Sequence, residues 1–352
     1  MFSLGQHEIW NQNRVSVQQE VEMKLNNRNW ISFFWLSILL VSGLFSKEKV
    51  KEFNTDNWDL QYGTVVKHMG RNALIGSATL KNVQLKNGII EVDIAINGSR
   101  SYPGVFFRKT SKDNYERFYI RPHRAGLYPD ALQYMPVVKG SETWQLYHGK
   151  GYTAGASLPI NRWVRFRIEI KGDQARIFIA DSKTAALVIN DLKHDEAAGQ
   201  IGLIGPRNGT AFFSNFSYRE RDDLVFDKVE TGKTDKNILR SWDLSRPIPA
   251  DKYDISKLNY PQFMTIFYAN WKSIHSDRKG LVNVSDYHAK QRGKKALVLA
   301  RYIFQSDKKD VVKLQFGYSD ELLILFNTRR IFYGNNSYQF RDPSYVGVVG
   351  YQ

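Results

Sequence analysis

Apolar and polar residues alternate along much of the chain between residues 58 and 218. The stretch RWVRFRIEIKG shows this most clearly. Phe166, Ile168 and Ile170 fall on one face, and the intervening arginines and glutamate fall on the other. A period of two is that of a strand with one face on a core and one in solvent. We therefore predict a half-buried β-strand here, and similar strands on both sides of it.

Turn signals separate these strands at short intervals. Asn87-Gly88 opens the run GIIEVDIAI, Asn97-Gly98 follows it, and Lys171-Gly172-Asp173 predicts a hairpin into ARIFIAD. Few credible helices lie between them. Short strands at this spacing predict an antiparallel sandwich or barrel.

A second series of strands follows a charged, weakly periodic stretch, residues 219–238, which we interpret as a linker. Strands resume with FMTIFYANW, KALVLARYIF, VVKLQFGY and ELLILFN. The sequence thus predicts an all-β protein of two antiparallel, jelly-roll-type β-sandwiches in tandem, over residues 47–218 and 239–352.

The first 46 residues are expected to be an N-terminal extension and a signal peptide. Lys24 and Arg28 follow a plausible start at Met23 and precede an uncharged run from Trp30 to Ser46. A basic start, an apolar run and a small-residue exit are typical of export signals. The run of about 17 residues is marginal for a spanning helix, so an uncleaved membrane anchor is the alternative. Either predicts an extracytoplasmic folded part, periplasmic or secreted.

Composition narrows the chemistry. The 352 residues are enough for two domains, and the absence of cysteine excludes disulfides, thiolate zinc sites and cysteine nucleophiles. The net charge of +15 favours an anionic partner such as an acidic polysaccharide or a membrane surface. Basic residues are interspersed with acidic ones and no recognition motif accompanies them, so we expect no nucleic-acid partner.

Several strands of the first series carry a family resemblance: GIIEVDIAI, VFFRK, NYERFYIR, INRWVRFRIEIKGDQARIFI and GQIGLIGPRNGTAFFSNFSY. Together they resemble the concanavalin A-like lectin/glucanase superfamily, especially its laminin-G-like and 3-keto-disaccharide hydrolase-like branches. The resemblance implies that the last strand, the aromatic one in GTAFFSNFSY, returns beside the first of these strands, GIIEVDIAI. The resemblance implies a jelly roll with a concave, ligand-facing sheet.

The second series is similar to a galactose-binding-like jelly roll, on the residues GLVNVSDYH, ALVLARYIFQSDKKDVVKLQFGYSDELLILFNTRRIFYGNN and YQFRDPSYVG. In such domains the segment FGYSDELLILFNTRRIFYG forms a strand, a turn and a strand. One or two closing strands would be expected after Gln352, so we expect this sandwich to be incomplete, with an unpaired edge.

Three carboxylates are candidates for catalysis: Glu91, Asp93 and Glu116. Glycosidases of this superfamily carry E-x-D-x-(x)-E on one strand, and retention requires two carboxyl groups about 5–5.5 Å apart. Glu91 and Asp93 match the first two positions, but Ala95, Ile96 and Asn97 follow, so the third acid is absent. Catalysis is therefore an alternative and not the leading hypothesis.

The strand RFYIRPH supplies candidate ligand-binding residues. Phe118 and Ile120 should face the core, which places Arg117, Tyr119, Arg121 and His123 on the opposite face. Further candidates near the same side are Tyr134, Trp144, Tyr147 and His148. Aromatic rings and planar polar groups are the usual sugar-binding mixture, and arginine matches carboxylates or sulfates. The alternative is a solvated sheet face covered by arginine stems.

No metal site is predicted, because no H-x-x-x-H or H-E-x-x-H spacing occurs. No cofactor is expected either, although a structural calcium held by backbone carbonyls would leave little trace in the sequence.

The leading hypothesis is an exported protein that binds a carbohydrate, neutral or acidic, on the concave face of the first sandwich. One alternative is a glycoside hydrolase-like enzyme acting on (3-keto-)glycosides. Another is a structural or protein-interaction module. The membrane would be a partner only through an uncleaved N-terminal segment.

Overall fold

The computed structural model describes residues 50–126, 128–227, 236–258, 262, 270–290, 293–309, 311–337 and 347–351. The predicted signal or anchor segment lies outside these residues. Within them, no helix has the length and apolar character needed to cross a membrane. The described elements are strands and short 3-10 helices, and every strand pair is antiparallel, which confirms the all-β class.

Fourteen strands and one 3-10 helix make up the first part. They are β1 (Trp58–His68), β2 (Arg71–Leu80), β3 (Gly88–Ile96), β4 (Gly104–Ser111), β5 (Asn114–Ile120), η1 (Pro122–Arg124), β6 (Leu132–Tyr134), β7 (Val137–Val138), β8 (Ser141–Glu142), β9 (Thr153–Ala154), β10 (Trp163–Lys171), β11 (Gln174–Ile179), β12 (Leu187–Ile189), β13 (Gln200–Ile204) and β14 (Ala211–Glu220).

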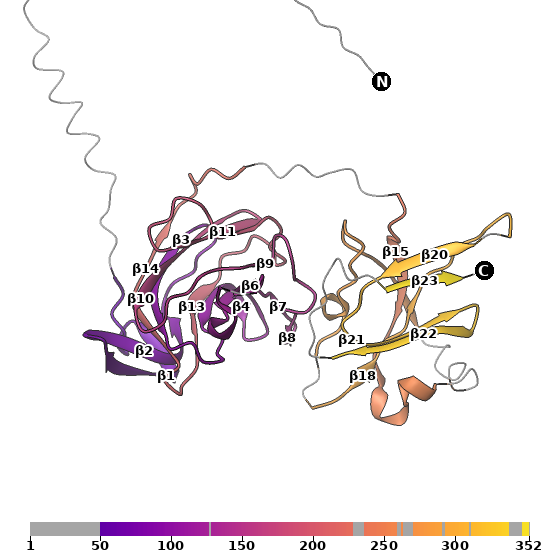
Figure 1. The fold of residues 1–352 in the computed structure, drawn as a ribbon, viewed down its shortest axis with the longest axis horizontal. Helices are drawn as coiled ribbons and strands as arrows, with labels where there is room; N and C mark the ends of the chain where they lie inside the picture. Colours follow the sequence, from indigo (N-terminus) through magenta and orange to yellow (C-terminus); the bar gives the residue numbers. More distant parts are fainter. Residues whose placement is uncertain are drawn as a thin grey trace, which may run out of the picture. The chain divides into compact units, whose positions relative to one another are not determined.

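These strands form two layers joined through β2. One layer has the order β12-β11-β10-β3-β14, and the other has the order β13-β4-β5-β6-β9 (Figure 1). β2 pairs with β14 at Leu74 and with β13 at Ala78 and Thr79. Gly76 lies between these contacts with φ +84, where a Cβ would approach the Tyr62 carbonyl oxygen to 2.2 Å. Glycine thus allows β2 to pass from one layer to the other.

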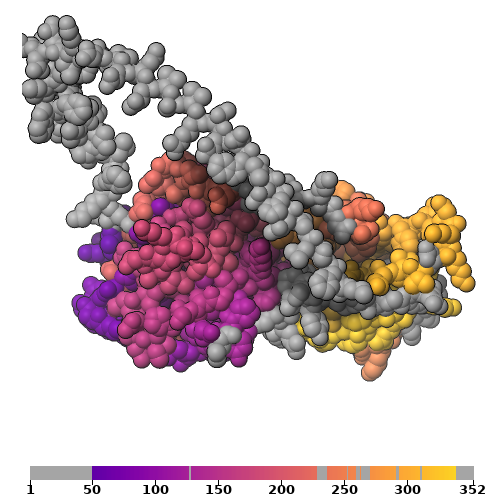
Figure 2. All heavy atoms as spheres, turned by 45° about the horizontal axis from the view of Figure 1, so that its top comes forward, coloured from indigo at the N-terminus to yellow at the C-terminus, as the bar shows by residue number. Residues whose placement is uncertain are grey.

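The core of this sandwich lies between the two layers. Phe118 from one layer and Phe166 from the other have ring centroids 6.2 Å apart. Trp58 is fully buried and lies edge-on against Phe216, with ring centroids 4.9 Å apart. In the space-filling view the residues of this part, coloured indigo to pink, pack into one continuous body on the face shown (Figure 2).

Three sequence predictions are confirmed in this part. Phe166, Ile168 and Ile170 of β10 all lie in the buried core, as the alternation indicated. β10 and β11 form the predicted hairpin, with Lys171 paired to Gln174 around a turn that contains Gly172. The aromatic strand β14 returns beside β3, from Ala211 opposite Ile96 to Glu220 opposite Gly88.

The remaining described elements are shorter. They are β15 (Ser241–Ser245), β16 (Ile248–Pro249), η2 (Ala250–Lys252), η3 (Ile255–Lys257), β17 (Trp271–His275), η4 (Val284–Asp286), β18 (Ala296–Leu297), β19 (Ala300–Arg301), β20 (Val312–Phe316), β21 (Asp320–Phe326), β22 (Arg329–Asn336) and β23 (Gly347–Tyr351).

These later strands form small antiparallel sets. β17, β15 and β19 make one sheet, and β16–β18, β20–β23 and β21–β22 are pairs. The β21–β22 pair confirms the predicted strand, turn and strand. The expected strand FMTIFYANW falls mostly outside the described residues, apart from its last two, and KALVLARYIF is divided between β18 and β19.

Burial differs between the two parts. Most of the buried apolar residues of the described chain belong to strands β1–β14 and their loops, whereas Leu244, Leu258 and Ile274 are the buried apolar residues described after residue 236. One later segment packs on the first core. Leu281 contacts the core cluster, and Asn283 donates from Nδ2 to the Tyr147 hydroxyl at 3.5 Å.

Candidate functional site

Strand β5 presents two different faces, as its alternation predicted. Phe118 and Ile120 lie in the core cluster between the layers. Tyr119 lies on the opposite face, where it packs with Met135 and Val137, and Trp144 covers this small cluster. Arg117 and Arg121 flank Tyr119 on that face, because they are two residues away on either side.

Two guanidinium groups lie close to the Tyr119 ring. The centre of the Arg117 guanidinium is 4.9 Å from the ring centroid, and that of Arg121 is 5.0 Å from it. The Arg121 guanidinium also lies 5.7 Å from the Trp144 ring centroid. Burial raises the pKa of the Tyr119 hydroxyl to about 12. Tyr119 is therefore a neutral phenol that stacks on cations.

Arg121 is held rigidly. Its Nη1 donates to the Asp130 carbonyl at 2.9 Å and to Gln133 Oε1 at 3.0 Å, and its Nη2 donates to the Tyr119 hydroxyl at 2.8 Å. The Asp130 carboxylate is fully buried and lies 3.4 Å from Arg121 Nη1 and 2.5 Å from Arg124 Nε. These contacts fix the guanidinium as a positioned positive charge.

Tyr102, from the loop between β3 and β4, lies over this face. Its ring is edge-on to Tyr119 and to His123, with centroids 5.7 Å away in both cases. Its carbonyl accepts from Arg117 Nη2 at 2.7 Å, and its hydroxyl accepts from Arg100 Nε at 2.9 Å. Tyr102 is 37% exposed, so its ring remains available to a ligand.

We call this set the arginine–tyrosine face, and it consists of Tyr102, Arg117, Tyr119, Arg121, His123 and Trp144. Two buried polar atoms in it lack a hydrogen-bond partner among the described residues, Arg117 Nε and His123 Nδ1. Arg117 is only 7% exposed. An unsatisfied buried donor costs about 1–3 kcal/mol, and an exception of this kind requires an explanation.

The arginine–tyrosine face and the side chains next to it carry positive charge. Four arginines (Arg100, Arg117, Arg121 and Arg124) accompany two carboxylates (Asp130 and Glu142), which gives a difference of two. Burial lowers the pKa of His123, and the nearby arginines lower it further, which favours the neutral imidazole. A second exposed ring lies at the margin, where the Arg124 guanidinium is 3.9 Å from the Tyr128 ring centroid.

Tyr134 and Tyr147 do not join this face. Tyr134 is fully buried in the core, where its hydroxyl donates to Glu116 Oε2 at 2.7 Å. Tyr147 lies in the same core and is covered by Asn283. His148 is half-buried in the loop between β8 and β9. The expected placement of Tyr134 and Tyr147 on the ligand side is wrong, because both side chains lie in the core. The placement of His148 stays a prediction.

The three candidate carboxylates do not converge. Glu91 and Asp93 lie on the outer face of β3, since the alternate residues Val92 and Ile94 lie in the core. Glu116 is fully buried on the core side of β5, in the other layer. Arg219 Nη1 lies 3.8 Å from Glu91 Oε2. The arrangement therefore lacks the facing carboxylate pair that glycoside hydrolysis requires.

Asp93 serves instead as the centre of an ion cluster. Its carboxylate accepts from Arg71 Nη1 at 2.6 Å, from Arg165 Nε at 3.1 Å and from Asn215 Nδ2 at 2.8 Å. The strand that resembles a catalytic motif thus carries an aspartate that joins β2, β10 and β14. Its function here is to neutralise two guanidinium groups across the sheet.

Replacing Asp93 with alanine is expected to lower the free energy of unfolding by about 1–3 kcal/mol, because two arginines and an amide lose their shared acceptor. The partly exposed arginines keep the loss below that of a fully buried pair. Urea denaturation measures it, with the exposed-site variant Asp181→Ala as control. An unchanged midpoint would contradict the structural role.

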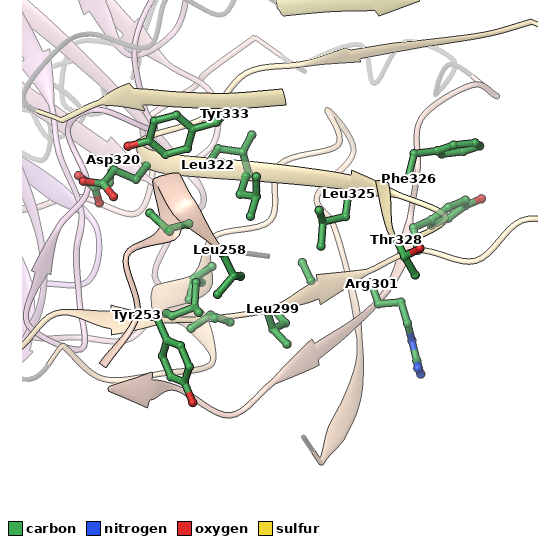
Figure 3. A pocket seen from close by; sticks show the side chains of 18 of the residues that line it. Tyr253, Leu258, Leu299, Arg301, Asp320, Leu322, Leu325, Phe326, Thr328 and Tyr333 are labelled. Atoms are coloured by element: carbon green, nitrogen blue, oxygen red, sulfur yellow. The ribbon is translucent and has the colours of Figure 1, made fainter. Parts of the chain in front are cut away.

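No group of three or more metal-ligating side chains occurs among the described residues. A broad recess lies in the later strands and has a mixed polar and apolar lining. Figure 3 shows Leu258, Leu299, Leu322 and Leu325 gathered around it. None of the side chains of β20, β21 and β22 is fully buried. Together with the mixed lining, this incomplete burial indicates an open space between strands.

The sequence reasoning missed Tyr102, Asp130 and Gln133. Gln133 could have been found from alternation, since it precedes the inward-facing Tyr134 and so lies on the other side of β6. Tyr102 and Asp130 are loop residues, and their positions depend on contacts with β5 that no sequence period encodes.

No family model matches the chain, and no curated protein matches it in sequence. Solved structures with a similar chain trace include the carbohydrate-binding module CBM66 from Bacillus subtilis, at 17% identity and a TM-score of 0.37. It covers 47% of this chain and 96% of its own. The galectin LEC-6 of Caenorhabditis elegans matches at 8% identity and a TM-score of 0.31, covering 46% of this chain and 99% of its own.

A third match is the VIP36 exoplasmic/lumenal domain in its Ca2+/Man3GlcNAc-bound form. The identity is 12% and the TM-score 0.37, over 52% of this chain and 90% of that one. The arginine–tyrosine face is therefore the feature of the molecule that indicates a function.

Proposed function

We propose that the protein binds carbohydrate on the arginine–tyrosine face and prefers sugars that carry a carboxylate or sulfate. The observation that carries this proposal is the exposed Tyr102 ring, which lies beside Arg117 and His123, each with a buried nitrogen that lacks a partner. Aromatic rings pack against the C–H faces of sugars, and guanidinium groups bind planar anions.

Tyr102 is the group that a sugar would meet first. Its ring is exposed, and its edge-on contacts with the Tyr119 and His123 rings fix the orientation of the ring. Since its backbone carbonyl accepts from Arg117 Nη2, a ligand that shifts Tyr102 would come within reach of the unsatisfied Nε. Binding would then remove a cost that the free protein carries.

The surplus of positive charge supports the preference for acidic sugars. The His123 imidazole is neutral at neutral pH in the free protein, and a bound anion would raise its pKa. Binding of an acidic ligand is therefore coupled to proton uptake. The affinity for an acidic ligand should therefore rise as the pH falls through the pKa that His123 has in the complex.

Replacing Tyr102 with alanine is expected to weaken sugar binding about tenfold, since a ring contact contributes up to about 1.5 kcal/mol. Calorimetric titration of the full chain with polygalacturonate oligosaccharides measures this. Tyr302→Ala is the matched control, because Tyr302 is 36% exposed but belongs to the later strands. Equal binding by both variants would place the ligand elsewhere.

The acidic preference has its own test. Affinity for polygalacturonate should exceed that for neutral dextran and should fall as salt is added, because exposed charges are screened beyond about 10 Å at 0.1 M salt. Arg100→Gln should weaken binding of the acidic ligand more than binding of the neutral one, because Arg100 Nε also donates to the Tyr102 hydroxyl. Absence of binding to either polymer by the folded protein would contradict the proposal and favour a structural or protein-interaction module.

We also propose that this face acts outside the cytoplasm. The basic start and apolar run at residues 24–46 support this. Fractionation of expressing cells, with N-terminal sequencing of the product, tests it.

A further inference from the structure

Strand β1 leaves one edge of its sheet open. Its eleven residues pair with β2 on one side, from Trp58 opposite Leu80 to His68 opposite Arg71. On its other side no described strand pairs with it, and it lies at the margin of its sheet (Figure 1). We call the outer side of residues 58–68 the β1 edge. It presents backbone donors and acceptors to any strand that approaches.

Apolar side chains line this edge. Tyr62 is 61% exposed, Val65 is 37% exposed, and Met69 in the following turn is 46% exposed. Proteins usually protect an open edge with proline, a bulge or inward-pointing charges. β1 contains no proline, and its single irregularity lies between Asp59 and Tyr62. Residues 62–68 are therefore a regular strand of seven residues in which Lys67 is the one charged side chain.

The edge is also rigid. Trp58 anchors the start of β1 in the core. Gly63 lies opposite Gly76 at the point where β2 bends. The two backbones are so close here that a side chain at residue 76 would place its Cβ 3.2 Å from the Gly63 Cα. A strand held at this end and paired along its length has little conformational entropy left to lose when it binds.

The sequence of this edge is complementary to itself in the antiparallel sense. A two-fold axis at Val65 places Val65 opposite its own copy. It places Tyr62 opposite His68, and Thr64 opposite Val66. Aromatic and β-branched cross-strand pairs of this kind stabilise sheets. Lys67 falls opposite Gly63, so no two like charges face each other.

Charge also favours the antiparallel arrangement. Asp56 and Asp59 lie at the start of the hairpin, whereas Lys67 lies near its tip, next to Arg71, whose charge is already paired with Asp93. A two-fold pairing brings the acidic start of one copy toward the basic tip of the other. Parallel pairing would place acid beside acid and base beside base.

We propose that the protein forms a symmetric homodimer by antiparallel pairing of the β1 edges of two copies. The interface is isologous, as in most two-fold dimers, and it joins two sheets into one. It does not depend on the proposed carbohydrate site, which lies on β5. A dimer would display that site twice, which increases the avidity for a polymeric ligand.

Cysteine cross-linking tests the register directly, because the chain has no cysteine of its own. Across an antiparallel pair the facing Cα atoms are about 4.5–5.5 Å apart, within the range of a disulfide. Val65→Cys in the full chain should cross-link to a dimer under mild oxidation. Tyr62→Cys should not, because its copy lies about six residues, or roughly 20 Å, further along the strand. Combining Tyr62→Cys with His68→Cys should restore cross-linking.

Light scattering on the eluting protein measures the mass without cross-linking. The wild type should show twice the 40.8 kDa of one chain. Val65→Lys should raise the dimer dissociation constant at least tenfold, since two ammonium groups meet at the axis. Val225→Lys, at a site that is 83% exposed on the segment after β14, is the matched control and should remain dimeric.

A monomeric wild type at all concentrations would overturn the proposal. So would equal cross-linking of Val65→Cys and Tyr62→Cys, which would indicate random edge contacts. Thermal unfolding of each variant shows whether its strands are intact, and loss of the dimer in a folded Val65→Lys chain supports the β1 edge as the interface.

Discussion

Replacing Arg108 with methionine is expected to lower the free energy of unfolding by about 3–5 kcal/mol, a large part of the stability of an ordinary domain. Arg108 is 1% exposed. Its Nε donates to the Lys86 carbonyl at 3.0 Å, and its Nη2 donates to the Gly172 carbonyl at 2.7 Å and to Asn87 Oδ1 at 3.3 Å. Methionine fills part of the volume but supplies no donor, so the Lys86 and Gly172 carbonyls lose this donor, while Asn87 Oδ1 keeps only the Gly172 amide.

The charge of Arg108 adds to this effect. It favours the ionised form of the buried Glu116 carboxyl, and its loss would raise the pKa of that carboxyl further. Urea denaturation followed by tryptophan fluorescence measures the change as a lower midpoint. Arg162→Met, at an exposed position before β10, is the matched control and should change stability by less than about 0.5 kcal/mol. A similarly small change for Arg108→Met would contradict the structural role of this guanidinium.

The alternation of apolar and polar residues predicted correctly which side chains of a single strand face the core. It placed Phe166, Ile168 and Ile170 in the core, and it placed Arg117 and Tyr119 on the face opposite Phe118. Arg108 shows where the pattern ends. It adopts φ +49 at an irregularity of β4 and is buried next to the buried Phe107, so two consecutive side chains point inward. A bulge of this kind leaves no trace in the polarity of the sequence.

The error at Tyr134 has a related cause, which is register. β6 pairs with β5 so that Tyr134 lies opposite Phe118 and Gln133 lies opposite Tyr119. Residues opposite each other in a sheet point to the same side, so Tyr134 enters the core with Phe118. A shift of one residue would have placed Tyr134 on the ligand side. The loop between β5 and β6 determines the register, and its length alone does not reveal it.

Asp93 shows a further limit. Its carboxylate was a candidate for catalysis on the strength of a local motif, but its partners are distant in sequence. Arg71 is 22 residues away and Asn215 is 122 residues away. A motif names the residue types on one strand, whereas the neighbouring strands determine whether a carboxylate is exposed for chemistry or neutralised. The resemblance to a glucanase strand therefore indicated the fold more reliably than the chemistry.

Replacing Glu116 with glutamine is expected to change how stability depends on pH. Glu116 is fully buried, and this burial raises the pKa of its carboxyl, although the hydrogen bonds from the His194 amide and the Tyr134 hydroxyl favour the charged form. The folded protein then holds the proton more tightly than the unfolded chain. The contribution of Glu116 to stability is therefore greatest at low pH. It is lost as the pH rises from the unfolded value, about 4.3, through the raised folded value.

Glutamine does not titrate, so the stability of Glu116→Gln relative to the wild type should increase with pH across this window and then become constant. The total change is about 1.4 kcal/mol for each unit by which the folded pKa exceeds the unfolded one. Urea denaturation of both proteins between pH 4 and pH 8 measures the difference, and Glu52→Gln, at an exposed glutamate, should show little of it. If the stability of Glu116→Gln relative to the wild type falls as the pH rises, the folded protein lowers the pKa of Glu116. In that case Arg108 and the two hydrogen bonds would outweigh desolvation, and the core would contain a carboxylate stabilised in its ionised form.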